Sequence, residues 1–149
     1  MALHLVRALY GHARSLQADV RSSDLEEWVV ASGCRIMPPL LLSIDTAGDT
    51  ARAVVDGERC LALWGVNPGG VAWMICTNEA VRRAHAMHRL FRSGIAEMHA
   101  LYPRLEAWAY YRNTVHHDWM EHFGFRRTGV THRLGMGLPF IQFVRYKEP

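Results

Sequence analysis

The spacing of apolar and polar residues predicts an alternation of short strands and helices along the chain. A strand over residues 3–8 precedes a weakly amphipathic helix over 9–19. Ser22-Ser23-Asp24 then offers hydroxyl and carboxylate groups that cap a helix start, with acids in the first turn. That helix should end near Gly33, and Pro38-Pro39 opens a further short helix.

Three consecutive strands follow, joined by tight turns. The predicted strands cover residues 51–55, 59–66 and 71–77. The turns are Asp56-Gly57 and Asn67-Pro68-Gly69-Gly70, both rich in residues that accept turn conformations. Such short connections join antiparallel neighbours, so this stretch predicts a three-stranded meander.

A long helix is predicted over residues 79–102, and Pro103 ends it. Its apolar residues recur at helical spacing: Ala84, Met87, Phe91, Ile95, Met98 and Tyr102. Its basic residues lie on another face: Arg82, His85, Arg89 and Arg92. The helix should therefore bury one side and leave the basic side in solvent.

Residues 104–125 form the most informative segment. A strand stops at Asn113, whose side-chain oxygen is placed to cap the helix that follows. Val115, Trp119 and Phe123 make one apolar face of that helix. Gly124 ends it, because glycine enters the left-handed region at little cost. Two further strands, 125–133 and 139–147, complete the chain.

Composition and charge narrow the class of protein. The 149 residues suit a single domain over 1–149 with a sizeable core, to which Trp64, Trp73, Trp108 and Trp119 should contribute. The net charge of +3 gives no argument for nucleic-acid binding. Three cysteines without paired spacing favour reduced thiols in a cytosol-like compartment. We expect no signal peptide and no membrane span, since no apolar run is long enough.

The segment 104–125 has a strand that ends at Asn113, then a helix, then Gly124-Phe125. That order resembles the last conserved stretch of the GNAT acetyltransferase superfamily. The predicted order of elements also matches that superfamily along the whole chain. The resemblance implies an α/β (α+β) fold: a mixed, mostly antiparallel sheet of about six to seven strands with helices on both faces. It also implies that the fourth and fifth strands, 71–77 and 104–113, splay apart to leave a V-shaped gap.

Further stretches resemble a smaller family of phage and prophage GNAT-like proteins, which includes internal virion protein A-type proteins of short-tailed phages. They are Leu61-Ala-Leu-Trp-Gly-Val66, Ala72-Trp-Met-Ile-Cys-Thr77, Asn113-x-x-His116-x-x-Trp119-Met120 and Gly137-Leu-Pro-Phe-Ile-Gln-Phe143. This resemblance implies a phage-type N-acetyltransferase-like protein acting on an amine. The alternative is a catalytically silent virion or host-factor-binding protein. The expected location is the host cytoplasm or the virion, and the expected assemblies are a homo-oligomer or the virion itself.

The superfamily uses acetyl-CoA, and the resemblance implies where this chain would hold it. Ile75, Cys76 and Thr77 would pair with the pantetheine arm, and Asn113 would lie beside it. Amides near Ala84, with the charges of Arg82 and Arg83, would face the pyrophosphate. The chain departs from the superfamily pattern here, because Arg83-x-x-Ala86 has no glycine to let the phosphates approach closely. The arginines can equally be a solvated helix face.

The resemblance also implies a proton donor for the leaving thiolate. The superfamily usually has a tyrosine seven residues after the asparagine, where this chain has Met120. His116, one turn earlier, is the candidate replacement, and it can equally be a packed or capping histidine. Asn113 and Tyr111 complete the expected catalytic set.

A general base is harder to place from the sequence. The candidate carboxylates are Glu79, Glu106, Asp24, Glu26 and Glu27. The last three also serve simply as acids that stabilise the dipole of their helix. We expect no metal site, because neither His-Glu-x-x-His nor Cys-x-x-Cys occurs.

Overall fold

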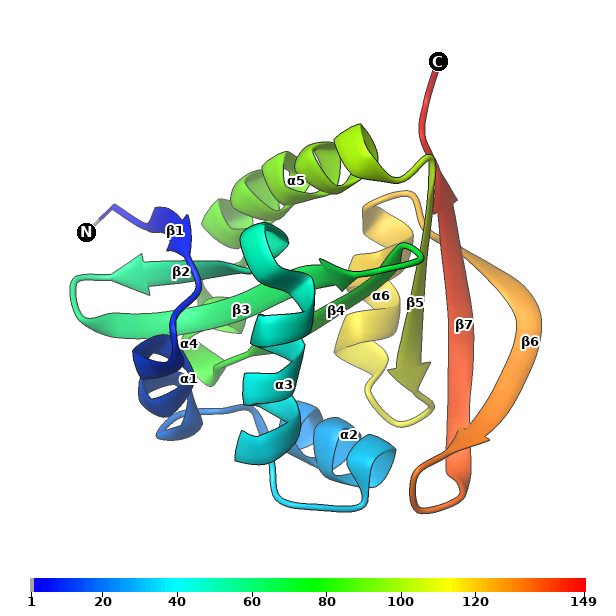
Figure 1. Ribbon diagram of the computed structural model, residues 1–149, viewed down its shortest axis with the longest axis horizontal. Coiled ribbons are helices and arrows are strands. Elements are labelled where there is room, and N and C mark those ends of the chain that lie inside the picture. Colours follow the sequence, from blue (N-terminus) through cyan, green and yellow to red (C-terminus); the bar gives the residue numbers. More distant parts are fainter. Residues whose placement is uncertain (1) are drawn as a thin grey trace.

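The computed structural model describes residues 2–149 as one mixed sheet between two layers of helices (Figure 1). Its seven strands lie in the order β1-β2-β3-β4-β5-β7-β6. The strands are β1 His4–Arg7, β2 Arg52–Asp56, β3 Arg59–Asn67, β4 Val71–Cys76, β5 Arg104–Tyr110, β6 Arg126–Leu134 and β7 Leu138–Tyr146. The helices are α1 Tyr10–Gln17, α2 Ser22–Ser32, α3 Met37–Ala47, α4 Asn78–Arg82, α5 Ala84–Leu101 and α6 Thr114–His122, with a short 3₁₀ turn η1 at Gly48–Thr50.

The sheet is antiparallel except where β4 meets β5. These two strands run parallel and pair in register only at Val71 and Glu106. Beyond that point they diverge toward their carboxyl ends, as Figure 1 shows. The predicted splay of the fourth and fifth strands is therefore confirmed, and it leaves a V-shaped gap whose vertex lies at the start of β4.

Each face of the sheet has its own apolar core. On one face α1 and α3 pack against β3, over a core that includes Leu16, Leu40 and Ile75. On the other face α5 and α6 cover a larger core. As predicted, α5 buries Met87, Phe91, Ile95 and Met98 in that core. No helix in the described part of the chain is long and apolar enough to cross a membrane.

The predicted long helix over 79–102 is in fact two helices. Helix α4 starts at Asn78 because the Thr77 side chain caps it, accepting the Ala80 N–H at 3.2 Å. The break falls at Arg83, whose backbone leaves the helical region at φ −106° and ψ 36°. The Arg83 guanidinium is anchored to Asp56 on β2 at 2.8 Å. The chain therefore changes direction at Arg83, between α4 and α5.

Two predicted helix caps are wrong. Helix α2 has Arg21 at the capping position, and no side chain caps it. Asn113 occupies the capping position of α6 but makes no capping hydrogen bond. Its side chain is fully buried and donates to the Asp24 carboxylate at 3.1 Å instead. Gly124 after α6 has φ +84°, as expected for a glycine that ends a helix.

The vertex of the gap depends on Gly70. Its carbonyl accepts the Glu106 N–H at 2.8 Å, and its φ is +84°. A Cβ at this position would lie 2.5 Å from the Arg104 carbonyl oxygen, whereas Gly69 has φ +91° with open space around it. Gly69 and Gly70 therefore both have left-handed backbone conformations. A side chain at Gly70 would clash with β5, whereas one at Gly69 would not.

We predict that Gly70→Ala lowers the free energy of unfolding by about 1–3 kcal/mol more than Gly69→Ala does. Both variants place a Cβ on a left-handed residue, and only the first also forces β5 away from β4. Denaturant titration of the two variants measures the difference. Equal destabilisation would mean that the contact at the vertex does not hold the strands together.

Candidate acyl-transfer site

Helix α2 closes the open end of the gap by bonding to both diverging strands. The Arg21 N–H donates to the Cys76 carbonyl at 3.0 Å. The Trp28 indole N–H donates to the Met74 carbonyl at 3.2 Å. On the other side of the gap, the Tyr110 N–H donates to the Glu27 carboxylate at 2.8 Å. One helix therefore spans from β4 to the end of β5.

The backbone of β4 exposes alternate residues to the gap. The Thr77 N–H bonds to Leu61 on β3, so Cys76 presents its N–H and carbonyl on the opposite side. The Cys76 N–H donates to the Asp24 carboxylate at 2.6 Å, and its carbonyl accepts from Arg21. The edge of β4 is thus already paired at Cys76 by residues of the same chain.

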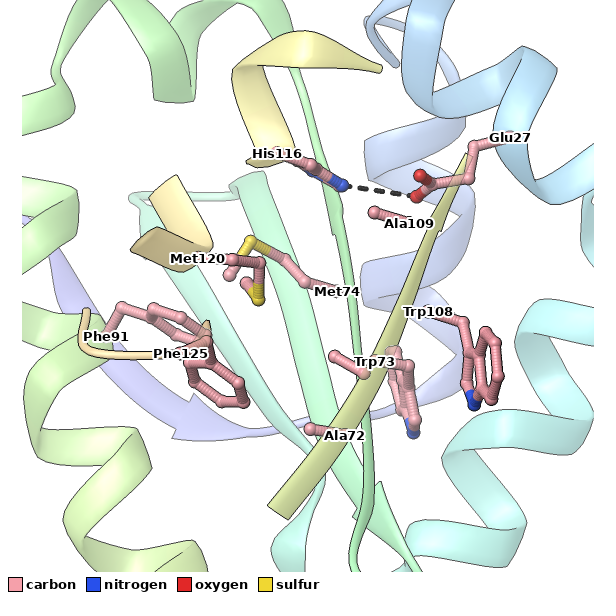
Figure 2. A pocket seen from close by; sticks show the side chains of 11 residues that line it. Glu27, Ala72, Trp73, Met74, Phe91, Trp108, Ala109, His116, Met120 and Phe125 are labelled. Atoms are coloured by element: carbon pink, nitrogen blue, oxygen red, sulfur yellow. Dashed lines mark hydrogen bonds and ion pairs between the residues drawn. The ribbon is translucent and has the colours of Figure 1, made fainter. Parts of the chain in front are cut away.

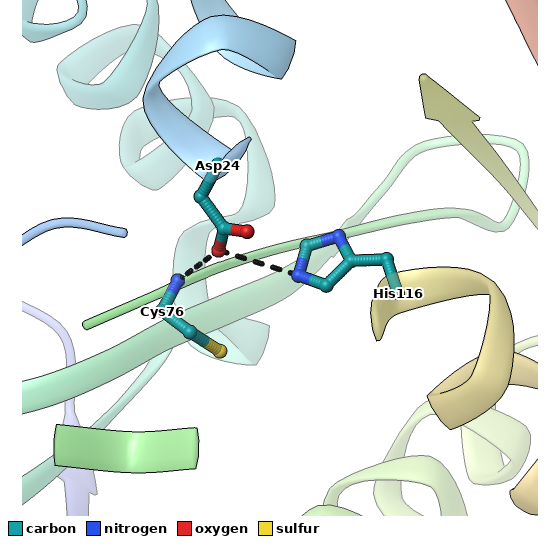
Figure 3. Close-up of side chains that lie close together, drawn as sticks. All are labelled: Asp24, Cys76 and His116. Carbon is teal, nitrogen blue, oxygen red and sulfur yellow. Dashed lines mark hydrogen bonds and ion pairs between the residues drawn. The ribbon is translucent and has the colours of Figure 1, made fainter. Parts of the chain in front are cut away.

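A cluster of buried ionic groups lies where α2, β4 and α6 meet, and Figure 3 shows two of them, Asp24 and His116, beside Cys76. Its members are Arg21, Asp24, Glu27 and His116, and we call it the ion cluster. His116 lies between the two carboxylates, with Nε2 3.3 Å from Asp24 and Nδ1 3.1 Å from Glu27. Arg21 and Asn113 both donate to the remaining Asp24 oxygen. The two acids are Asp24 and Glu27, and the two cations are Arg21 and protonated His116. All four groups lie close together.

The cluster shifts the pKa values of its members. Burial alone would lower the pKa of His116, but Asp24 and Glu27 outweigh it, and the pKa stands well above its usual value. Burial would raise the pKa of Asp24, yet His116, Arg21 and the Cys76 amide together bring it below its usual value. The two carboxylates therefore favour the protonated form of His116, the form that donates a proton rather than accepts one.

A cavity runs through the gap between β4 and β5 (Figure 2). Glu27 and His116 lie at its polar end, and Met120 lies on its wall one turn after His116. The other lining residues are Ala72, Trp73, Met74, Phe91, Ala107, Trp108, Ala109 and Phe125. Its volume is about 40 Å³, enough for a few water molecules or a small acyl group.

The three residues predicted to bind pantetheine take different positions. Ile75 is fully buried, and its backbone pairs with Leu63 on β3. Thr77 likewise bonds to β3 and caps α4. Cys76 alone faces the gap, and burial raises the pKa of its thiol. A pantetheine arm at this edge has to replace the contacts that Asp24 and Arg21 make with Cys76.

The residues predicted to bind the pyrophosphate lie together at the corner before α5. Ala84 begins the helix, and the amides of its first turn have no acceptor within the helix. Arg82 is exposed and pairs with Glu79 at 2.9 Å, while Arg83 pairs with Asp56. This corner supplies a helix N-terminus with small side chains and nearby positive charge.

The predicted catalytic residues are only partly brought together. His116 lines the cavity. Asn113 is buried behind it as a partner of Asp24 and Arg21. Tyr111 lies outside the cavity, is 37% exposed, and packs against the Tyr110 ring.

Two acids of α2 are buried and paired in a way that the sequence did not predict, although Asp24 does lie in the first turn of the helix. Asp24 and Glu27, interpreted chiefly as first-turn acids, are 0% and 6% exposed. Their spacing of three residues puts both on one helical face, directly before the bulky Trp28. Two acids and an indole on one face of a helix are a signal that this face packs inward on basic partners.

One group of described residues has the geometry of metal ligands. Ligand atoms of Asp24, Cys76 and His116 all lie within 4.8 Å of one another. In this arrangement, however, the Asp24 carboxylate already accepts from Arg21, Asn113 and the Cys76 amide. The positive charge that a metal would supply to this carboxylate comes from Arg21 and the imidazolium.

Comparison with known proteins identifies the fold. The amino-acid sequence matches no protein-family model and no curated protein. Among solved structures, Ard1 from Thermoplasma volcanium is similar over 100% of both chains, with a TM-score of 0.78 and 10% identity. A GNAT-family acetyltransferase from Bacillus cereus ATCC 10987 also covers 100% of both chains, with a TM-score of 0.65 and 14% identity. The chain has the GNAT acetyltransferase fold.

A further structure of this fold supports the same assignment. The GNAT-family acetyltransferase from Bacillus anthracis is similar over 98% of this chain and 95% of its own, with a TM-score of 0.67 and 10% identity. Identities this low establish the GNAT fold and leave the chemistry to be argued from the residues of the gap.

We predict that the free energy of unfolding falls as pH rises above about 6.5. The raised pKa of His116 means that its contribution is complete below the unfolded-state value near 6.5 and is lost as pH rises through the folded-state value. Asp24 and Glu27 on α2, Cys76 on β4 and Arg21 are the groups that face it. The slope should approach about 1.4 kcal/mol per pH unit.

Urea titrations between pH 6 and 9 measure this dependence. His116→Gln should remove most of it, whereas His85→Gln, on the exposed start of α5, should leave it intact. Parallel profiles for the wild type and His116→Gln would show that the imidazolium does not stabilise the fold.

Proposed function

We propose that the chain is an acyl-CoA-dependent N-acyltransferase, with acetyl-CoA as the expected acyl donor. The observation that carries this proposal is the cavity through the gap, with Glu27 and His116 at its polar end. In acyl transfer the amine nitrogen bonds to the acyl carbon and the carbon–sulfur bond breaks. One proton from nitrogen is then released, and the leaving thiolate gains one.

His116 is the group we assign to protonate the leaving thiolate. Its carboxylate neighbours favour its protonated form, it lines the cavity, and it shares a helix face with Met120. Glu27 is hydrogen-bonded to Nδ1, which orients the ring, whereas Nε2 lies 3.3 Å from Asp24 and makes no hydrogen bond. Met120, which stands where the superfamily usually has tyrosine, has no proton to give.

Coenzyme A would be held at two places. Its diphosphate fits the first turn of α5, where Ala84 and Ala86 keep the approach open and Arg82 supplies charge. Its pantetheine arm would lie along β4, where the Cys76 amide now bonds to Asp24. Binding therefore requires that α2 release this edge, and when bound the coenzyme supplies an activated acyl thioester.

The pairing of Cys76 within the chain favours a second candidate function. If α2 never leaves the edge of β4, the chain is a GNAT-fold protein without acyl transfer, which serves as a binding or virion protein. The short stretches that resemble phage and prophage proteins support a phage origin for either function. The expected partners are accordingly an amine substrate, or a phage or host protein.

We predict that acetyl-CoA binds and that Arg82→Glu weakens it by about 3- to 10-fold. Reversing an exposed charge beside a helix N-terminus costs on the order of 1 kcal/mol toward an anion. Isothermal titration calorimetry measures both affinities. Arg133→Glu, an equally exposed arginine on β6, is the matched control and should leave the affinity unchanged.

Absence of heat and of a thermal shift at millimolar acetyl-CoA would favour the second candidate. An Asp24→Asn variant sharpens this test, because it weakens the hold on the Cys76 amide. If the edge is closed only by this contact, the variant should bind coenzyme more tightly than the wild type once corrected for stability.

We predict that His116→Gln lowers turnover by about 10²–10⁴-fold while the affinity for acetyl-CoA stays nearly constant, as expected for loss of a general acid. His117→Gln is the matched control, since His117 is also buried but bonds to the Tyr110 carbonyl outside the cavity. Steady-state kinetics and melting temperature are measured on the same preparations. Full turnover in folded His116→Gln would exclude the assigned role.

A further inference from the structure

A second cavity opens on the face of the sheet covered by α1, α2 and α3. Tryptophans from three different elements wall it: Trp28 of α2, Trp73 of β4 and Trp108 of β5. Phe140 of β7 closes its floor, and its volume is about 190 Å³. We call it the tryptophan cavity. All three tryptophans are half-buried, so each leaves part of its ring toward the opening.

The indole N–H groups of these rings are already used. Trp28 donates to the Met74 carbonyl, Trp73 to the Asn67 side chain at 3.1 Å, and Trp108 to the Glu106 carboxylate at 2.7 Å. The rings therefore offer the cavity apolar and π surface rather than hydrogen-bond donors. Trp28 and Trp73 meet edge to face at 5.7 Å, and His132 stacks on Trp108 at 4.8 Å, which fixes the rings in place.

The charged side chain that lines the tryptophan cavity is acidic. Among the described residues that line the tryptophan cavity, Glu27 is the charged one. Its carboxylate lies at the inner end, and the indole faces carry the negative side of an aromatic quadrupole. The indole faces favour a cationic ligand over an anionic one. The Glu27 carboxylate already contacts His116 and accepts the Tyr110 N–H, so a cationic group at this end shares the carboxylate with the imidazole.

The tryptophan cavity continues into the gap. Glu27, Ala72, Trp73, Met74 and Trp108 line both cavities. Figure 2 shows Glu27 reaching toward His116 at one end of this shared wall, with Trp73 and Trp108 at the other. A ligand whose polar end meets Glu27 therefore places that end beside His116, with its body among the tryptophans.

We propose that the tryptophan cavity binds the acceptor, and that the acceptor is a small primary amine on an apolar or aromatic body. This inference rests on the proposed function and names its substrate class. The amine enters as an ammonium group at Glu27, gives up one proton to water and then attacks as the neutral amine, with its apolar body against the three indoles. Among the described lining residues Glu27 is the one with a charged side chain and the others are apolar or aromatic, which disfavours acidic and polyhydroxylated amines as acceptors.

The test compares three aromatic probes that differ in charge and one small hydrophilic amine. These are 2-phenylethylamine, its neutral analogue 2-phenylethanol, its anionic analogue 3-phenylpropionate, and ethanolamine, which lacks the aromatic body. Tryptophan fluorescence and calorimetry measure binding with and without coenzyme A. We expect 2-phenylethylamine to bind about tenfold or more tightly than each of the other three, as a charge-assisted contact within an aromatic wall predicts.

Two variants test which residues of the cavity produce the preference for 2-phenylethylamine. Glu27→Gln should abolish the preference for 2-phenylethylamine over 2-phenylethanol, whereas Glu26→Gln, the neighbouring residue outside the cavity, should keep it. Trp108→Leu should weaken 2-phenylethylamine by about 3- to 30-fold. Trp73→Phe, a smaller change, provides the same comparison if Trp108→Leu does not fold.

The outcomes separate this inference from the proposed function. Tight binding of 3-phenylpropionate or ethanolamine, equal to that of 2-phenylethylamine, would overturn the substrate class. So would acylation of hydrophilic amines by a protein that binds acetyl-CoA yet does not bind 2-phenylethylamine in either titration. Binding of 2-phenylethylamine without any binding of acetyl-CoA would support the cavity assignment and overturn the acyltransferase.

Discussion

The carboxylate of Asp24 is the contact on which the rest of the structure depends. It accepts from the Cys76 amide on β4, from Asn113 after β5 and from Arg21, and it lies beside His116 on α6. Two splayed strands would otherwise leave their edges unpaired in the interior, at a cost of about 1–3 kcal/mol for each unsatisfied group. A single side chain thus joins the two halves of the sheet beside the cavity that runs through the gap.

The same contact explains why so many charged groups are buried together. A carboxylate out of water needs cations and donors around it, and Arg21 and His116 are those cations. Removing one partner leaves the others uncompensated, which typically costs about 3–5 kcal/mol in a buried pair. The ion cluster therefore stabilises the fold and also raises the pKa of His116. A substitution in the cluster will change both the stability and this pKa.

The fold was largely predictable from the sequence, and the site was not. Regular apolar spacing predicted most of the individual strands and helices, because such patterns report which face of each element is buried. The mixed sheet and the splayed strands were implied by the resemblance to the GNAT superfamily. Asn113 was interpreted as a helix cap, since a local pattern cannot reveal that Asp24, far away in the chain, offers a stronger partner. Arg83 was placed inside one long helix, because its pairing with Asp56 on β2 is likewise a distant contact. Trp73 and Trp108 were predicted to be core, yet they are half-buried around a cavity.

Helix α2 carries, within two turns, the group that holds the edge of β4 and the groups that wall the tryptophan cavity. Asp24 lies three residues from Glu27 and four from Trp28, so these side chains move as one rigid body. A shift of α2 that frees the Cys76 amide must also reshape the cavity around Trp28. Ligands on the two sides of the sheet are then thermodynamically linked. If the first ligand changes the affinity for the second by some factor, the second changes the affinity for the first by the same factor. Because this linkage is reciprocal, its strength is the same whichever ligand binds first, and it is set by how far α2 moves.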